Sequence, residues 1–196
     1  MHERLLVTGF GPFGKDTVNP SGLVAAKLGG LVLPVAADEA WRRVRAEVAV
    51  RRPRFVLALG VAGGRAHVCV EKCAVNAAAY PIPDDDGALH HGPLDERLPH
   101  SAARSPGLPA AELARAIRRS GVAARVSTDA GRYVCNHFYW HLLHGFAGRA
   151  AFLHVPRLPE VEAAHGGKGP SLPLEATERA VLAAARWLER RGWLAD

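Results

Sequence analysis

Short apolar runs alternate with amphipathic segments along most of the chain, and this alternation limits the fold more than any other feature. The apolar runs predict strands over residues 4–8, 31–35, 55–61, 122–128 and 150–155. The amphipathic segments predict helices over residues 21–28, 38–51, 110–120, 133–146 and 174–191. Strands that alternate with helices predict the α/β class, with a mostly parallel sheet covered on both sides. A length of 196 residues suits one domain spanning residues 1–196.

The charge pattern and the lack of long apolar segments narrow the range of partners. The formal net charge is +6, but most of the positive charge is arginine spread along predicted helices, as in residues 41–45 and 186–191. Without a basic run interleaved with aromatic side chains, we expect no nucleic-acid partner. No apolar stretch approaches membrane-spanning length, and residues 1–9 do not resemble a signal peptide. We therefore expect no membrane partner and a cytoplasmic location, where the three cysteines stay reduced.

Cys135 is the candidate nucleophile. Residues 126–137 begin as a strand, break at Ala130-Gly131 and continue into a helical pattern, so Cys135 falls in the first turn of a helix. Free backbone N–H groups and the positive end of the helix dipole favour an anion there. A thiol in that position is biased toward the thiolate, which is the reactive form.

Two further residues are unusual for their surroundings. His154 closes the apolar run 150–155, at the carboxyl end of a predicted strand, where sites gather in α/β folds. Glu71 lies in the alternating run 67–76 among valines and cysteines, and a buried carboxylate needs a partner. With Cys135 they predict a Cys–His–Glu triad. The alternative for His154 alone is a core histidine bonded to the backbone, and spacing does not establish that the three residues meet.

The glycine-rich loop of residues 9–14 follows the first predicted strand and has the spacing of a dinucleotide-binding fingerprint. The fingerprint needs a helix that opens at once, whereas here the helix is predicted only from Ser21, so a nucleotide-binding protein is a weak alternative. Phe10 and Phe13 in this loop favour an apolar wall for a small flat ligand. The alternative, that both rings fill the core, is equally open.

Three histidines and one long segment are weaker indications of a functional site. His137, His141 and His144 have a spacing that binds zinc on a helix face, but the sequence has no HExxH motif and no obvious fourth ligand. We expect a half-exposed helix face, with no metal and no cofactor. The segment 81–109 has little periodicity and is predicted to be a functional or mobile loop that covers the site.

A set of short motifs occurs in a fixed order over nearly the whole chain. It comprises residues 8–14, 19–21, 63–65, 70–76, 82–84, 129–136, 152–156 and 170–172. Each motif alone is a weak signal, but the ordered set is specific. Together they resemble the type I pyroglutamyl peptidases, or pyrrolidone-carboxylate peptidases, which are cysteine peptidases.

The resemblance implies a fold, a site and a substrate. The fold would be a three-layer α/β/α sandwich around a mostly parallel twisted sheet, and the chain would form a homo-oligomer, a dimer or tetramer. The substrates would be peptides with an N-terminal pyroglutamyl (5-oxoproline) residue. The catalytic residues of the family fall on Glu71, Cys135 and His154. Its substrate pocket falls on Phe10 and Phe13, with Asn19 ordering the loop.

The sequence departs from the family pattern in the 81–109 segment. Many members have arginine where this chain has Pro81, and asparagine where it has Asp85. If that arginine helps to place the cysteine, activity would be reduced. The alternative function is therefore a catalytically impaired homologue that acts as a 5-oxoproline- or peptide-binding module. We expect an active peptidase because the remaining chemistry is intact.

Overall fold

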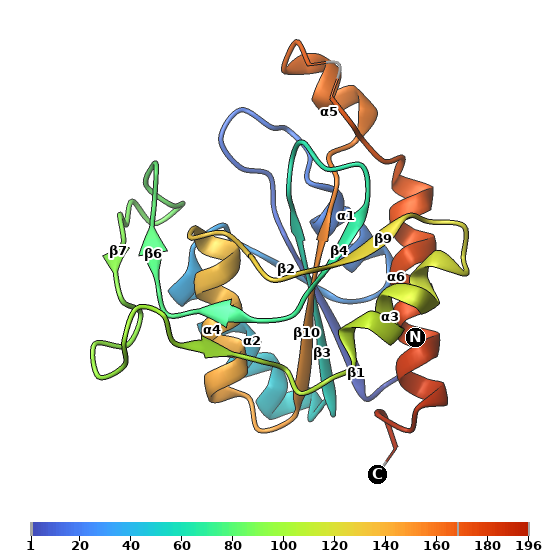
Figure 1. Cartoon of the computed structure of the whole chain (residues 1–196), viewed down its shortest axis with the longest axis horizontal. Helices are drawn as coiled ribbons and strands as arrows, with labels where there is room; N and C mark the ends of the chain where they lie inside the picture. Colours follow the sequence, from blue (N-terminus) through green and yellow to red (C-terminus); the bar gives the residue numbers. More distant parts are fainter. Residues whose placement is uncertain (1, 168, 196) are drawn as a thin grey trace.

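The computed structural model describes residues 2–167 and 169–195, and its centre is a six-stranded sheet in the order β2-β1-β3-β10-β4-β9 (Figure 1). In chain order these strands are β1 Leu5–Phe10, β2 Leu31–Leu33, β3 Phe55–Val61, β4 Val68–Glu71, β9 Ala124–Ser127 and β10 Arg149–Val155. The helices are α1 Pro20–Lys27, α2 Ala37–Arg51, α3 Ala110–Arg118, α4 Val134–Gly145, α5 Pro159–Ala164 and α6 Leu174–Arg190. The predicted α/β class is confirmed.

The sheet contains one reversal of strand direction. Strands β2, β1, β3 and β10 run parallel, β4 runs antiparallel to β10, and β9 runs parallel to β4. The sheet is therefore mostly parallel, as predicted. The carboxyl ends of β1, β3 and β10 meet at one edge, which is where α/β proteins place their sites.

Helices cover both faces of the sheet. Figure 1 shows α3 and α6 on one side and α2 and α4 on the other. Strand β3 contributes Phe55 and Leu57 to the core that includes α1, α3 and α6, and Val56 and Ala58 to the core that includes α2 and α4. This alternation explains why β3 is apolar at every position, and the three-layer sandwich is confirmed. Within residues 2–167 and 169–195, no helix combines the length and apolar character that a membrane crossing requires.

The alternating run 67–76 does not form one continuous strand. Strand β4 ends at Glu71, and the chain then leaves the sheet and passes across α4 as β5, Ala74–Val75. The Asn136 side chain holds it there, accepting the Val75 N–H at 2.9 Å and donating to the carbonyls of Val75 and Ala77 at 3.0 Å each. The period-two pattern did not reveal this bend because residues on both sides of it are extended.

The segment 81–109 is more regular than a long loop. Strand β7, His91–Gly92, pairs with β6, Ala78–Ala79, and β8, Ala103–Arg104, pairs with β5. The buried Asn76 side chain donates to three carbonyls, at Asp95, Leu98 and Pro99, and accepts the Asp95 N–H at 2.7 Å. One buried amide therefore anchors much of this segment.

Candidate active site

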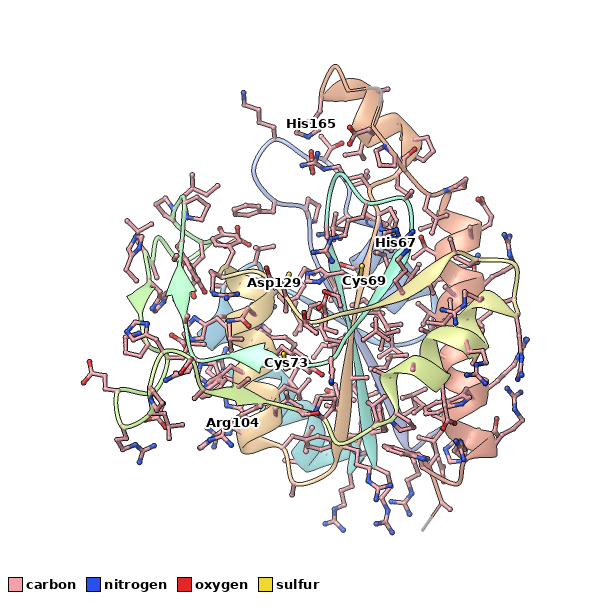
Figure 2. The ribbon with its side chains drawn as sticks, viewed as in Figure 1. His67, Cys69, Cys73, Arg104, Asp129 and His165 are labelled. Atoms are coloured by element: carbon pink, nitrogen blue, oxygen red, sulfur yellow. The ribbon has the colours of Figure 1, made fainter. Side chains whose placement is uncertain are left out.

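Cys135 is the second residue of α4 and is half-buried. The approach to the helix is set by Asp129, whose carboxylate accepts the Gly131 N–H at 2.9 Å, and by Gly131 itself, which has a φ of +82°. Asp129 lies in the loop between β9 and α4 (Figure 2). The N-cap residue of α4, Tyr133, makes no side-chain cap hydrogen bond. The free N–H groups of its first turn are therefore available beside the thiol.

The Cys135 sulfur lies directly against strand β3. A Cβ atom added at Gly60 would be 2.9 Å from Cys135 Sγ and 2.8 Å from the nearest ring atom of Phe152. Such distances are too short for any side chain, so only glycine allows α4 to place its thiol here. The sulfur is thereby fixed at the carboxyl edge of the sheet.

His154 and Glu71 form a buried pair across β10 and β4. In the antiparallel register His154 is opposite Cys69, so Glu71, two residues further along, is its diagonal neighbour on the same face. The His154 Nδ1 and Glu71 Oε1 atoms are 2.8 Å apart, and the residues are 4% and 1% exposed. Because Nδ1 is bonded to Glu71, Nε2 is the nitrogen left to face the thiol.

The surroundings of His154 favour its charged form. Burial alone would lower the pKa of His154, but hydrogen bonds to Cys135 and Glu71, together with the charges of both groups, raise it to about 9. The imidazole is therefore protonated at neutral pH. A protonated imidazole beside a sulfur is the arrangement that activates cysteine nucleophiles.

Arg65, in the connection between β3 and β4, was missed as a site residue by the sequence analysis. Its Nη1 atom donates to Glu71 Oε1 at 3.2 Å, and the Tyr139 hydroxyl donates to the Glu71 backbone carbonyl at 3.3 Å. The need of Glu71 for a charged partner was the available signal. The sequence analysis assigned that partner to an imidazolium alone.

The other two cysteines are in different environments. Figure 2 shows Cys69 on β4 and Cys73 beyond the end of that strand. Burial raises the pKa of both thiols, and the Cys73 Sγ atom contacts the Thr128 carbonyl at 3.5 Å. Both thiols therefore stay protonated at neutral pH.

A cavity of about 150 Å³ lies in front of Cys135, and its lining is mainly apolar. Phe10 and Phe13 both contribute to its wall. Phe10 is 3% exposed and packs edge-on against Phe138, with the two ring centroids 5.6 Å apart. The Phe10 ring therefore both fills the core and borders the cavity. Phe13 is half-buried, 5.5 Å from the Tyr133 ring.

Asn19 connects the Phe10–Phe13 loop to helix α1. It is the N-cap of α1, and its side-chain oxygen Oδ1 accepts the Ser21 N–H at 3.0 Å. Its amide donates to the Gly11 carbonyl at 2.8 Å. One side chain thus fixes both ends of the loop that carries the aromatic wall.

The sequence model of a family described as pyroglutamyl peptidase matches residues 3–190. This chain belongs to the pyroglutamyl peptidase family. A pyrrolidone-carboxylate peptidase from Escherichia fergusonii is 36% identical over 195 residues, which cover 91% of this chain and 89% of the relative.

Solved pyroglutamyl peptidase structures share the fold of this family member. Pyroglutamyl peptidase I from Bacillus amyloliquefaciens superposes with a TM-score of 0.87 at 30% identity, covering 95% of this chain and 94% of the other. The pyrrolidone carboxyl peptidase from Thermococcus litoralis gives a TM-score of 0.82 at 31% identity, covering 95% of each chain.

Asp85, one of the two departures from the pyroglutamyl peptidase pattern, is bonded to a residue that lines the cavity. Asp85 accepts the Val35 N–H at 2.7 Å and donates its own N–H to the Val35 carbonyl at 3.0 Å, and Val35 lines the cavity. The Tyr133 hydroxyl donates to the Pro83 carbonyl at 3.1 Å. The described residues that line the cavity include none from 81–109. This segment instead bonds to two residues that do line it, Val35 and Tyr133. Arg157 and Val161 line the cavity instead, and the sequence analysis did not predict them.

Proposed function

We propose that this protein hydrolyses the amide bond after an N-terminal pyroglutamyl residue of a peptide, with Cys135, His154 and Glu71 as its catalytic group. The observation that carries the proposal is the buried Glu71–His154 pair beside a thiol on the wall of an apolar cavity. Membership of the family supports the same reaction.

We propose one role for each group of the site. The Cys135 thiolate attacks the carbonyl carbon of the scissile amide bond, not that of the lactam ring. N–H groups of the first α4 turn stabilise the oxyanion that forms, each such donor typically contributing about 3 kcal/mol. Protonated His154 then gives its proton to the departing amine as the carbon–nitrogen bond breaks, leaving a thioester. His154 takes a proton from water, which attacks the thioester and releases 5-oxoproline and the thiolate. Glu71 orients the imidazole throughout.

The cavity suits a neutral ring better than a charged N-terminus. A 5-oxoproline residue has no free amine and needs no acidic anchor, and the carboxylate that does line the cavity, Asp16, is paired with His165. The mainly apolar wall, with Phe10 and Phe13, is proposed to hold the faces of the ring. Asn19 is proposed to keep that wall in place through its bonds to Gly11 and Ser21.

The test is release of a fluorophore from a pyroglutamyl amide. We expect Cys135→Ser to lower kcat by roughly a thousandfold or more, because the variant lacks the thiolate that attacks the carbonyl carbon. The matched control is Cys73→Ser, which removes a half-buried thiol outside the cavity and should keep full activity. Equal turnover by the wild type and Cys135→Ser would refute the mechanism. Binding of 5-oxoproline by the wild type without turnover would instead identify a binding module.

We also propose that the chain forms a homo-oligomer, a dimer or tetramer, and works in the cytoplasm. The family resemblance supports the homo-oligomer. The proposed mechanism needs a reduced thiol, which supports the cytoplasmic location. Light scattering of the purified protein measures the oligomeric state directly.

A further inference from the structure

A second cluster of titratable side chains lies on the side of α4 away from the thiol. His137 and His141 come from α4, Asp38 from the first turn of α2, and His90 from the residue before β7. The Asp38 Oδ1 atom is 3.0 Å from His141 Nε2 and 3.9 Å from His137 Nε2, and Asp38 Oδ2 is 4.0 Å from His90 Nε2. All four side chains line one cavity of about 260 Å³.

The ligand atoms are close to the spacing of a metal site. Those of Asp38, His137 and His141 all lie within 4.8 Å of one another. Two ligand atoms bound to a tetrahedral Zn²⁺ at its usual bond lengths are about 3.3 Å apart. Rotamer changes of the half-exposed His141 and exposed Asp38 side chains are enough to close that difference.

His137 is already held as a metal-binding histidine would be. It is 5% exposed, and its Nδ1 atom is 2.9 Å from the Tyr80 hydroxyl. When Nδ1–H donates to that oxygen, the lone pair of Nε2 faces the cluster, which is the outer bond that ligating histidines commonly make. Tyr80 is itself buried, so this orientation is fixed by the core.

The cluster is poorly explained as an ion-pair network. Three imidazoles converge on the Asp38 carboxylate, so a single negative charge faces three rings. Neutral imidazoles with a carboxylate are a typical ligand set for Zn²⁺.

We propose that Asp38, His90, His137 and His141 form a binding site for a divalent transition metal, with Zn²⁺ as the best match. The ion would connect the first turn of α2, the middle of α4 and the segment that carries β7. Its role would be structural, because the site lies on another face of α4 than the Cys135 cavity and shares none of its lining residues.

The experiment titrates ZnCl₂ into chelator-treated, desalted protein by calorimetry. Because zinc also binds thiolates, the background is the Cys135→Ser variant. We expect one ion per chain, and a rise in the unfolding midpoint with zinc. His141→Ala and, as a second variant on an exposed position, Asp38→Asn should each weaken binding by about tenfold or more. The control is His144→Ala, which removes an exposed histidine of α4 that does not line the cavity.

A spectrum of the Co²⁺-loaded protein separates this site from any thiol site. Nitrogen and oxygen ligands give no thiolate-to-cobalt charge-transfer band, and we expect none. The proposal is overturned if the Cys135→Ser protein binds no zinc, if His141→Ala and Asp38→Asn bind it as tightly as their background, or if the thiolate band appears. Neither measurement depends on peptidase activity.

Discussion

At the scale of single residues, Glu71 controls the charge of the site. It is almost fully buried, and its Oε1 atom is hydrogen-bonded to both His154 Nδ1 and Arg65 Nη1. Hydrogen bonds to Glu71 and Cys135 keep the pKa of His154 near 9 against the opposing effect of burial. Glu71 thus helps to set the protonation state of the residue that is proposed to transfer the proton.

Replacing Glu71 by glutamine should therefore move a pH profile as well as lower a rate. The Glu71→Gln side chain keeps its size but not its charge, so the pKa of His154 falls. Protonated His154 is lost as pH rises through about 9 in the wild type, so the alkaline limb of kcat/KM should lie there and shift to lower pH in the variant. We expect kcat/KM to fall by roughly 10² to 10⁴. An unchanged limb would mean that Glu71 does not set the charge of His154.

The wall of the cavity in front of Cys135, where the substrate is proposed to bind, gives a second residue-level prediction. Phe13 is only half-buried, so Phe13→Ala removes ring contact without emptying the core. We expect KM for a pyroglutamyl amide to rise by about tenfold, in line with the 1–3 kcal/mol of a hydrophobic pocket contact, while kcat changes less. Leu23→Ala, an exposed leucine of α1, is the matched control. A fall in kcat at constant KM would place Phe13 in the chemical step instead.

The site residues differed in how far sequence could predict them. Glu71, Cys135 and His154 stood out because each is chemically unusual for its local pattern, and the structure places them together, while their catalytic roles stay predictions. Arg65 could not be paired with Glu71 because that contact depends on the shape of the β3–β4 connection. The pairing of Asp38 with the α4 histidines was likewise invisible, because about a hundred residues separate them.

At the scale of elements, the contact between α4 and β3 fixes the position of Cys135, the proposed nucleophile. A helix with a cysteine at its second position is held against a strand that has glycine at the point of contact. The sequence predicted both elements, since their periodicities are strong. It did not predict the reversed direction of β4 and β9, because an apolar pattern has no direction. That reversal is what makes Glu71 the diagonal neighbour of His154.

A methyl group at residue 60 should displace the thiol. In Gly60→Ala the new Cβ would meet Cys135 Sγ and the buried Phe152 ring at under 3 Å, so one of them must move. We expect unfolding free energy to fall by roughly 1–3 kcal/mol, as for other overpacked cores, and activity to fall in the protein that remains folded. In the control Gly11→Ala the new Cβ has no neighbour closer than 3.6 Å. Full activity in Gly60→Ala would show that the contact is not required.

At the scale of the whole molecule, two hydrophobic cores share one sheet. Trp187 and Trp193 belong to the core on the α6 side, whereas Trp41 and Trp140 belong to the core on the α2 and α4 side. From Phe55 to Leu59, successive residues of β3 belong alternately to one core and to the other. Neither core can be formed without the strands that complete its neighbour.

The chain is therefore predicted to unfold as one domain in a single cooperative step. Variants that keep only the tryptophans of one side, with phenylalanine at the other two positions, report each core separately. We expect their fluorescence transitions in urea to coincide with each other and with the loss of helical circular dichroism. Two separated midpoints would divide the molecule into two units.

The antiparallel join between β10 and β4 has a consequence for the timing of synthesis. The acid and the imidazole that meet there are 83 positions apart in the chain, and the imidazole belongs to the last strand of the sheet to be translated. By the proposed mechanism, a polypeptide still emerging from the ribosome has its sulfur and its carboxylate but lacks the imidazole that donates the proton. Each new copy therefore becomes competent for catalysis only after residue 154 has been translated and β10 has joined the sheet.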